Sequence, residues 1–185
     1  TAAQRRLGWL PTGETLPDDE HATRHRRITL LLFAHVPFLL ALGVFSGTMP
    51  VTEAVIPVTP LWLVGVQLTL LTAVTAVSRY DGLSRRQQTT LSAVGWMLAT
   101  MQLVQFSGGY IEAHFHFFVA VGVLASYEDW LPFGLGLLYV VVGHGLFATV
   151  FEAGRVYNHA AAINNPWVWG GVHGVFVTML AASEL

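Results

Sequence analysis

The sequence of 185 residues contains no cysteine and no lysine, and only 11% of its residues are charged. The lack of cysteine excludes disulfides, thiolate metal ligands and the covalent attachment of a c-type haem. Soluble domains carry roughly 25% charged residues, so the low charge content is typical of a membrane protein. Because lysine is missing, all nine basic residues are arginine, and their positions decide the expected orientation.

Long apolar runs take the place of the missing charges: 54% of the residues are hydrophobic and the mean hydropathy is +0.56. A helix needs roughly 20 apolar residues to cross about 30 Å of hydrocarbon. We therefore expect an all-α fold, a polytopic membrane bundle of six helices over residues 28–185, after a polar segment 1–27. The six stretches are 28–48, 58–78, 88–108, 110–127, 131–151 and 166–183.

Arginine sets the expected orientation of this bundle in membrane lipid. Five arginines precede the first stretch and three lie between the second and third, whereas Arg155 alone lies between the fifth and sixth. Because arginine concentrates in cytoplasmic loops, we expect both termini and the segment 1–27 on the cytoplasmic side. This segment has no apolar region of the kind found in cleaved signal peptides, so we expect none.

Histidines inside the apolar stretches are the candidate functional residues. Ionisable residues within membranes are rare, face the bundle interior and suggest a functional site. Counting about 1.5 Å per helical residue puts one group of them at a shared depth in the outer third of the bilayer. These are His114, His116, His144 and His173. His35 is expected deeper, and His159 in the outer loop. A single such histidine is often a neutral side chain hydrogen-bonded across helices, but four on three helices indicate an organised site.

Helix geometry separates the two histidines of the run "EAHFHFF". His114 and His116 are two positions apart and point to nearly opposite faces, whereas Glu112 and His116 are four apart and share a face. The shared face suits a pair of metal ligands, or a carboxylate that orients an imidazole. One histidine is therefore expected to bind while the other packs against a neighbouring helix.

Glycines flank the other two histidines, in "GHG" around His144 and in "GGVHG" before and after His173. Such glycines commonly let helices pack closely, but they also leave room for a flat macrocycle beside each imidazole. Two imidazoles from two helices can hold haem iron. We therefore expect a b-type haem with His144 and His173 as axial ligands, and with Arg155 and His159 binding its propionates.

A bare copper, zinc or iron ion is the alternative cofactor, since imidazole suits each of these metals. The candidate ligands of this ion are the four histidines at the shared depth, together with the Glu112 carboxylate or the deeper His35. These are His144, His173, His116, His114, Glu112 and His35. The sequence contains no phosphate-binding glycine loop and no nucleophile elbow, so we expect no enzyme. It contains no basic stripe for nucleic acid either.

Several segments together resemble a known family. They are "FAHVP" in the first stretch, "GGYIEAHFHFFV", "YEDWLPF", "VYNHAA" and "WVWGGVHGVFV". This combination resembles the six-helix N-terminal membrane sensor region of prokaryotic chemotaxis receptors and diguanylate cyclases, over most of residues 24–185. The resemblance implies a sensory input domain in the cytoplasmic (inner) membrane, a cytoplasmic output module on the full-length chain, and a homodimer. The histidine pair common in the fifth helix of that family is reduced here to "GHG".

The leading hypothesis from the sequence is a membrane-embedded sensor that binds b-type haem and responds to redox state or a diatomic gas. A change at the iron would shift the sixth helix and so signal to the output module. His116 and His114, supported by Glu112, would lie beside the haem or replace its ligands. A transition-metal sensor and a membrane b-type electron-transfer protein are the alternatives, and a small transporter is less well supported.

Overall fold

The computed structural model describes residues 16–48, 55–150 and 153–183, and these residues are mostly helical. The helices are α2 Asp18–Val44, α3 Leu61–Ser78, α4 Arg85–Phe106, α5 Ile111–His114, α6 His116–Ala125, α7 Trp130–Val150, α8 Ala160–Asn164 and α9 Pro166–Ser183, with a short 3-10 turn η1 at Ala153–Arg155. Two-residue strands, β1 Gly47–Thr48 and β2 Val55–Ile56, form one antiparallel pair. The all-α prediction is confirmed apart from this small pair.

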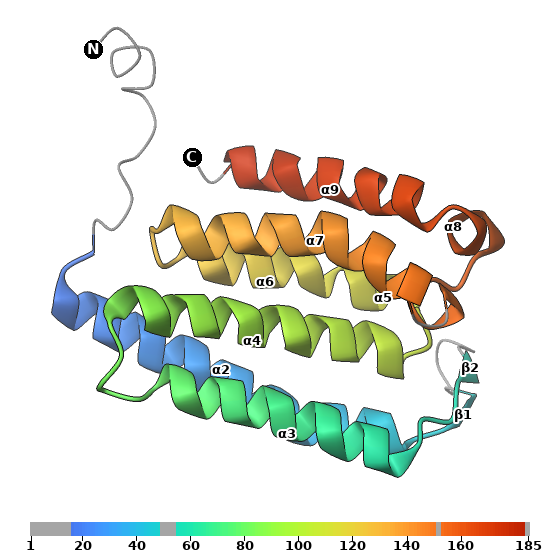
Figure 1. Ribbon diagram of the computed structural model, residues 1–185, viewed down its shortest axis with the longest axis horizontal. Helices are drawn as coiled ribbons and strands as arrows, with labels where there is room; N and C mark the ends of the chain where they lie inside the picture. Colours follow the sequence, from blue (N-terminus) through green and yellow to red (C-terminus); the bar gives the residue numbers. More distant parts are fainter. Residues whose placement is uncertain (1–15, 49–54, 151–152, 184–185) are drawn as a thin grey trace, which may run out of the picture.

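The long helices lie side by side in one bundle, with α5 and α6 following one another as a single rod (Figure 1). Each of the six predicted stretches contains a helix. Helices α2, α3 and α7 are long and apolar enough to cross a membrane, with mean hydropathies of 1.8 to 1.9. It stays a prediction that all six stretches cross the membrane and that both termini are cytoplasmic.

Apolar side chains cover the outside of the bundle as well as its core. On α3, Leu61 and Trp62 are each 70% exposed and Val66 is 59% exposed. The core is formed by fully buried side chains such as Leu32, Leu71 and Leu124. Soluble proteins rarely expose large contiguous apolar patches, whereas lipid solvates such a face. The outer surface of the described residues therefore suits a bilayer.

The first helix begins earlier than the predicted boundary at residue 28. Helix α2 starts at Asp18, and its first turn carries Asp18, Asp19 and Glu20. Acidic side chains at a helix N-terminus interact favourably with the macrodipole, so these residues start the helix well before its apolar part. The predicted helix over 110–127 also differs, since it is divided at Phe115 into α5 and α6.

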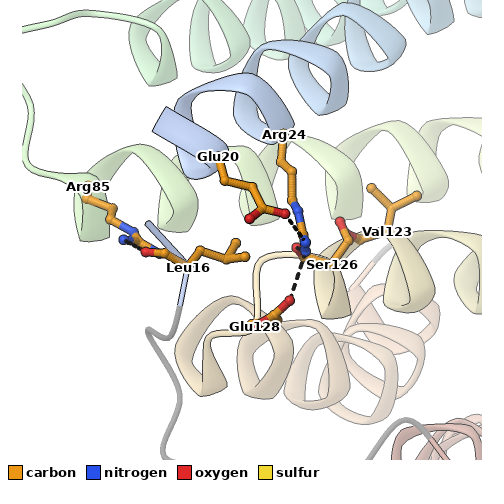
Figure 2. A network of polar contacts seen from close by, with 7 residues as sticks. All are labelled: Leu16, Glu20, Arg24, Arg85, Val123, Ser126 and Glu128. Atoms are coloured by element: carbon orange, nitrogen blue, oxygen red, sulfur yellow. Dashed lines mark hydrogen bonds and ion pairs between the residues drawn. The ribbon is translucent and has the colours of Figure 1, made fainter. Parts of the chain in front are cut away.

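One end of the bundle holds the beginning of α2, the end of α9 and the α3–α4 and α6–α7 connections (Figure 1). Figure 2 shows that Arg24 of α2 reaches across this end. Its guanidinium donates to the Ser126 carbonyl at 2.7 Å and to Glu128 at 3.0 Å, and it also pairs with Glu20. Arg24 thereby fastens α2 to the α6–α7 connection, and we call this the Arg24 end.

A buried polar network lies beside Arg24. His25 Nε2 donates to the Ser78 carbonyl at 2.9 Å, because a carbonyl can only accept. In the neutral imidazole the other nitrogen, Nδ1, then accepts from the Tyr127 hydroxyl at 2.8 Å. Ser92 Oγ lies 3.0 Å from the same hydroxyl. These contacts join α2, α3, α4 and the α6–α7 connection, and they leave both ring nitrogens of His25 paired.

Candidate functional site: two histidine groups

Three histidines from three helices meet towards the opposite end of the bundle. His114 ends α5, His144 lies in α7 and His173 lies in α9. The ring centroids of His144 and His173 are 4.7 Å apart, and the His114 centroid is 5.2 Å from each of them. His114 and His144 are only 4% and 1% exposed. We call this group the three-histidine cluster.

The hydrogen bonds of the cluster fix which ring nitrogens carry protons. His114 Nδ1 lies 3.0 Å from the Tyr110 carbonyl, and His144 Nδ1 lies 2.7 Å from the Val140 carbonyl. Because carbonyl oxygens only accept, both Nδ1 atoms carry the proton, and in the neutral ring each Nε2 keeps a free lone pair. His144 Nε2 is buried without a hydrogen-bond partner, whereas the Val156 carbonyl lies beside His114 and the Trp169 carbonyl lies beside His173.

Tyr157 closes the cluster from the segment between η1 and α8. Its ring lies nearly parallel to those of His114 and His173, at centroid distances of 6.0 and 6.1 Å, and its hydroxyl donates to the Pro166 carbonyl. The Tyr157 side chain is 1% exposed. Burial raises the pKa of its phenol, so the hydroxyl stays protonated. The ring therefore acts as an apolar cover over the three imidazoles.

Gly109 makes this cover possible. Its φ is +73°, and a Cβ at this position would lie 2.6 Å from the Tyr157 backbone nitrogen. Only glycine tolerates both the left-handed conformation and this close approach. The turn between α4 and α5 thus lies directly against the segment between η1 and α8.

His116 belongs to a different group. Its Nε2 lies 3.0 Å from His35 Nε2 on α2, and its Nδ1 lies 2.8 Å from Thr100 Oγ1 on α4. His35 Nδ1 donates to the Leu31 carbonyl. The ring of His116 also stacks on Trp96, at a centroid distance of 5.9 Å and an angle of 15°. We call this group the His35–His116 pair.

The structure thus divides the predicted histidine layer. The expectation that His114 and His116 point to opposite faces agrees with their separation into two groups. However, His114 rather than His116 joins His144 and His173. His35 matches the simpler interpretation, a histidine hydrogen-bonded across helices.

The remaining predicted site residues lie away from the three-histidine cluster or at its edge. Glu112 is exposed on α5. Arg155 donates to Thr59 Oγ1 and to the Val58 carbonyl, which attaches η1 to the segment before α3. His159 accepts from the Ala162 amide at the start of α8, and its ring packs edge-on against Trp169.

The glycines around the cluster are used for helix packing. A Cβ on Gly145 would lie 2.2 Å from the Trp167 ring, and one on Gly174 would lie 2.4 Å from Val141. A Cβ on Gly170 would lie 3.1 Å from the Val141 carbonyl. The space that the sequence suggested for a macrocycle is therefore occupied by α7 and α9 themselves, and these residues do not fit a haem as they are packed.

The chemistry of the three-histidine cluster suits a metal ion, whereas the present placement of its side chains does not. A metal-binding histidine usually donates its other N–H to a carbonyl, as His114 and His144 do. Within residues 16–48, 55–150 and 153–183, however, no three His, Asp or Glu side chains are placed so that they could hold an ion. The nitrogens have the required lone pairs, but at least one ring must turn before three of them point to one atom.

Two members of these groups were missed by sequence reasoning. Thr100 and Trp96 hold His116 from α4, yet each is an ordinary residue of an apolar helix and carries no signal of its own. Tyr157 lies between Arg155 and His159, the two residues expected to bind propionates, and its ring is what touches the cluster. A sequence gives no indication of which loop side chain covers a buried site.

Comparison with known proteins supports a role in signalling. No family model and no solved structure matches the chain. The chain is 50% identical over 183 residues to the Transducer protein Htr8 of Halobacterium salinarum. This similarity covers 98% of the chain but 28% of the relative, so the chain spans less than a third of that protein. The relationship to sensory transducers is thereby supported, while the six-helix domain type stays a prediction.

Proposed function

We propose that this chain is the sensory input domain of a membrane transducer, and that its signal acts at the three-histidine cluster. One observation carries the proposal: imidazoles from three helices lie together, and the buried His144 Nε2 among them has no hydrogen-bond partner. An unpaired buried polar atom costs about 1–3 kcal/mol. A ligand that accepts this lone pair would recover that free energy.

The ligand that suits these atoms best is a transition-metal ion such as copper, zinc or iron. Neutral imidazole is a common ligand for each of them. The His114 and His144 rings are already held in the tautomer that presents Nε2, by the Tyr110 and Val140 carbonyls. The Tyr157 ring keeps water away from the cluster, which strengthens any bond to the ion.

Signalling would follow from the rearrangement that binding requires. Because the rings do not point to one atom, an ion can be held only after at least one ring turns, and this turn would act on the helix that carries the ring. A ligand changes a conformational equilibrium by its difference in affinity for the two states. An output module on the longer chain, working in a homodimer, would receive this change. The similarity to a transducer several times longer supports such a module.

Metal binding to the purified chain in lipid nanodiscs tests the proposal. Isothermal titration with zinc, and with cuprous ion under anaerobic conditions, should show one site per chain. The variants His114→Ala and His144→Ala should each weaken binding at least 10-fold. His21→Ala is the matched control, because His21 Nε2 is also buried and unpaired but lies at the Arg24 end. Equal binding in all three variants would show that the cluster is not the site.

An absorption spectrum tests the haem hypothesis on the same samples. Chain expressed with haem supplied should show no Soret band, given the contacts of Gly145 and Gly174. A Soret band that disappears in His144→Ala would overturn the metal-ion proposal and support haem binding. The function would then be either gas sensing or electron transfer.

A further inference from the structure

A set of exposed arginines lies at the Arg24 end of the bundle. Arg24 and Arg85 are paired there with acidic side chains. Four further arginines are exposed, and no ion pair joins their guanidinium groups to any residue that the structure describes. They are Arg26 and Arg27 of α2, Arg79 at the end of α3 and Arg86 in the first turn of α4. We call them the exposed arginine group.

On α2, these arginines stand directly before side chains that suit lipid. Arg26 and Leu30 are four positions apart, as are Arg27 and Leu31, so each arginine shares a face with the leucine one turn further along. Leu30 and Leu31 are 50% and 53% exposed. An arginine in such a position lays its apolar stem along the helix and keeps its guanidinium in the headgroup layer. This face of α2 therefore changes from basic to apolar within one turn.

The ends of α3 and α4 repeat this arrangement. Arg79 follows a turn in which Val77 is 50% exposed, and the neighbouring Tyr80 is 66% exposed. Exposed tyrosine is common where a membrane protein meets the bilayer surface. Arg86 and Val94, which is 41% exposed, are eight positions apart and lie on one side of α4. Three helices thus carry guanidinium groups next to exposed apolar side chains.

The contacts of the bundle place these arginines at a common level. His25 Nε2 donates to the Ser78 carbonyl at 2.9 Å, which joins α2 to the end of α3. Arg26 follows His25 and Arg79 follows Ser78, so the two arginines lie at the same height along the bundle. The α3–α4 connection lies at this end as well, and Arg86 comes directly after it (Figure 1).

The acidic side chains of this end are not paired with the exposed arginine group. Glu20 and Glu128 pair with Arg24, and Asp18 lies 3.6 Å from Arg85. The other acidic residues here are Asp19, Asp81 and Asp129. None of their carboxylates forms an ion pair with the four arginines among the described residues. An anion from the surroundings therefore has four guanidinium groups available to it.

The chemistry of these groups favours phosphate. A guanidinium donates two parallel N–H···O bonds to a phosphate, whereas an ammonium group acts only as a point charge. All nine basic residues of the chain are arginine. A phosphatidylcholine headgroup carries its own choline cation beside the phosphate, but phosphatidylglycerol carries none. An anionic phospholipid therefore leaves its phosphate free to accept from arginine.

We propose that the exposed arginine group binds the headgroup phosphates of anionic phospholipids, and that these lipids stabilise the bundle at the Arg24 end. The inference goes beyond the proposed function and needs no ligand at the three-histidine cluster. Arg155, at the opposite end, donates instead to Thr59 Oγ1 and to the Val58 carbonyl. Anionic lipid is therefore expected to gather at one end of the bundle.

Electron paramagnetic resonance of spin-labelled lipids tests the proposal, with the purified chain in phosphatidylcholine vesicles. The spectrum separates lipid in contact with protein from free lipid, and so gives the association constant of labelled phosphatidylglycerol relative to labelled phosphatidylcholine. A basic residue near the bilayer surface strengthens the attraction to anionic lipid about 5-fold. We expect a ratio of about 5 for the unaltered chain. Replacing all four arginines by glutamine should lower it to about 1.

Arg155→Gln is the matched control, because it removes one arginine from the opposite end and should leave the ratio unchanged. The quadruple variant changes only exposed side chains and should keep the circular dichroism spectrum of the unaltered chain. A ratio of about 1 in the unaltered chain would overturn the proposal. The same high ratio in the quadruple variant would overturn it too, since the preference would then come from other residues.

Thermal melts in an uncharged detergent distinguish lipid from free phosphate. A ligand that binds only the folded chain raises Tm. Added phosphatidylglycerol should raise the Tm of the unaltered chain, but not that of the quadruple variant. Inorganic phosphate should have no more effect than chloride at equal ionic strength. If inorganic phosphate raised Tm as much as phosphatidylglycerol, the group would be a site for free phosphate and the lipid proposal would be wrong.

Discussion

Removal of one hydroxyl group at the Arg24 end should destabilise the bundle measurably. In Tyr127→Phe, His25 Nδ1 loses its partner at 2.8 Å, and Ser92 Oγ loses its contact at 3.0 Å. Tyr127 is fully buried, so water cannot replace the hydroxyl. An orphaned buried polar atom costs about 1–3 kcal/mol, and the Ser92 hydroxyl can turn to a helix carbonyl. We expect a loss of about 2 kcal/mol.

A thermal melt followed by circular dichroism in detergent measures this loss. For a chain of this size, about 2 kcal/mol corresponds to a fall in Tm of about 4–8 °C. Tyr139→Phe is the matched control, because the Tyr139 hydroxyl is buried without a partner and its removal should leave Tm equal or higher. Equal falls in Tyr127→Phe and Tyr139→Phe would refute the reasoning, since the effect would then come from packing and not from the network.

Two further predictions concern helix packing and orientation. Gly145→Val should separate α7 from α9, because even a Cβ at this position would overlap the Trp167 ring. The rate of amide hydrogen exchange in α9 should therefore rise. Gly134 on the same helix faces open space, so Gly134→Val should leave the exchange rate unchanged. The variants Asp81→Cys and Asn158→Cys should react with a membrane-impermeant thiol reagent from opposite sides of the membrane, with Asp81→Cys reacting from the cytoplasmic side. The reverse pattern would contradict the orientation expected from the arginines.

The positions of the helices could be read from the sequence because each apolar stretch is long and bounded by polar residues. Boundaries were less predictable. The start of α2 at Asp18 depends on the acidic first turn, which lies outside the apolar pattern. The division at Phe115 has no marker, because neither glycine nor proline stands at the break. Local geometry there follows from the contacts that His114 and His116 make on different sides.

The composition of the histidine groups could be predicted only in part. Counting residues gives the depth of a side chain, but not the direction in which its helix faces. Depth therefore placed both His114 and His116 with His144 and His173, whereas in the structure only His114 joins them. The i,i+2 spacing correctly separated the two histidines. In the sequence, the glycines beside His144 and His173 are equally consistent with close helix packing and with room for a macrocycle. Their contacts with Val141 and Trp167 in the structure favour packing.

The two ends of the bundle differ in how their buried polar atoms are paired, and this difference bears on function. At the Arg24 end, both ring nitrogens of His25 are hydrogen-bonded, so the network stabilises one arrangement of α2, α3 and α4. In the three-histidine cluster, three imidazoles gather and the buried Nε2 of His144 has no hydrogen-bond partner. Replacing those imidazoles by apolar side chains of similar size would remove that cost, so stability alone does not account for them. The ligand proposed for the cluster would account for them, whereas the paired network at the Arg24 end is accounted for by stability alone.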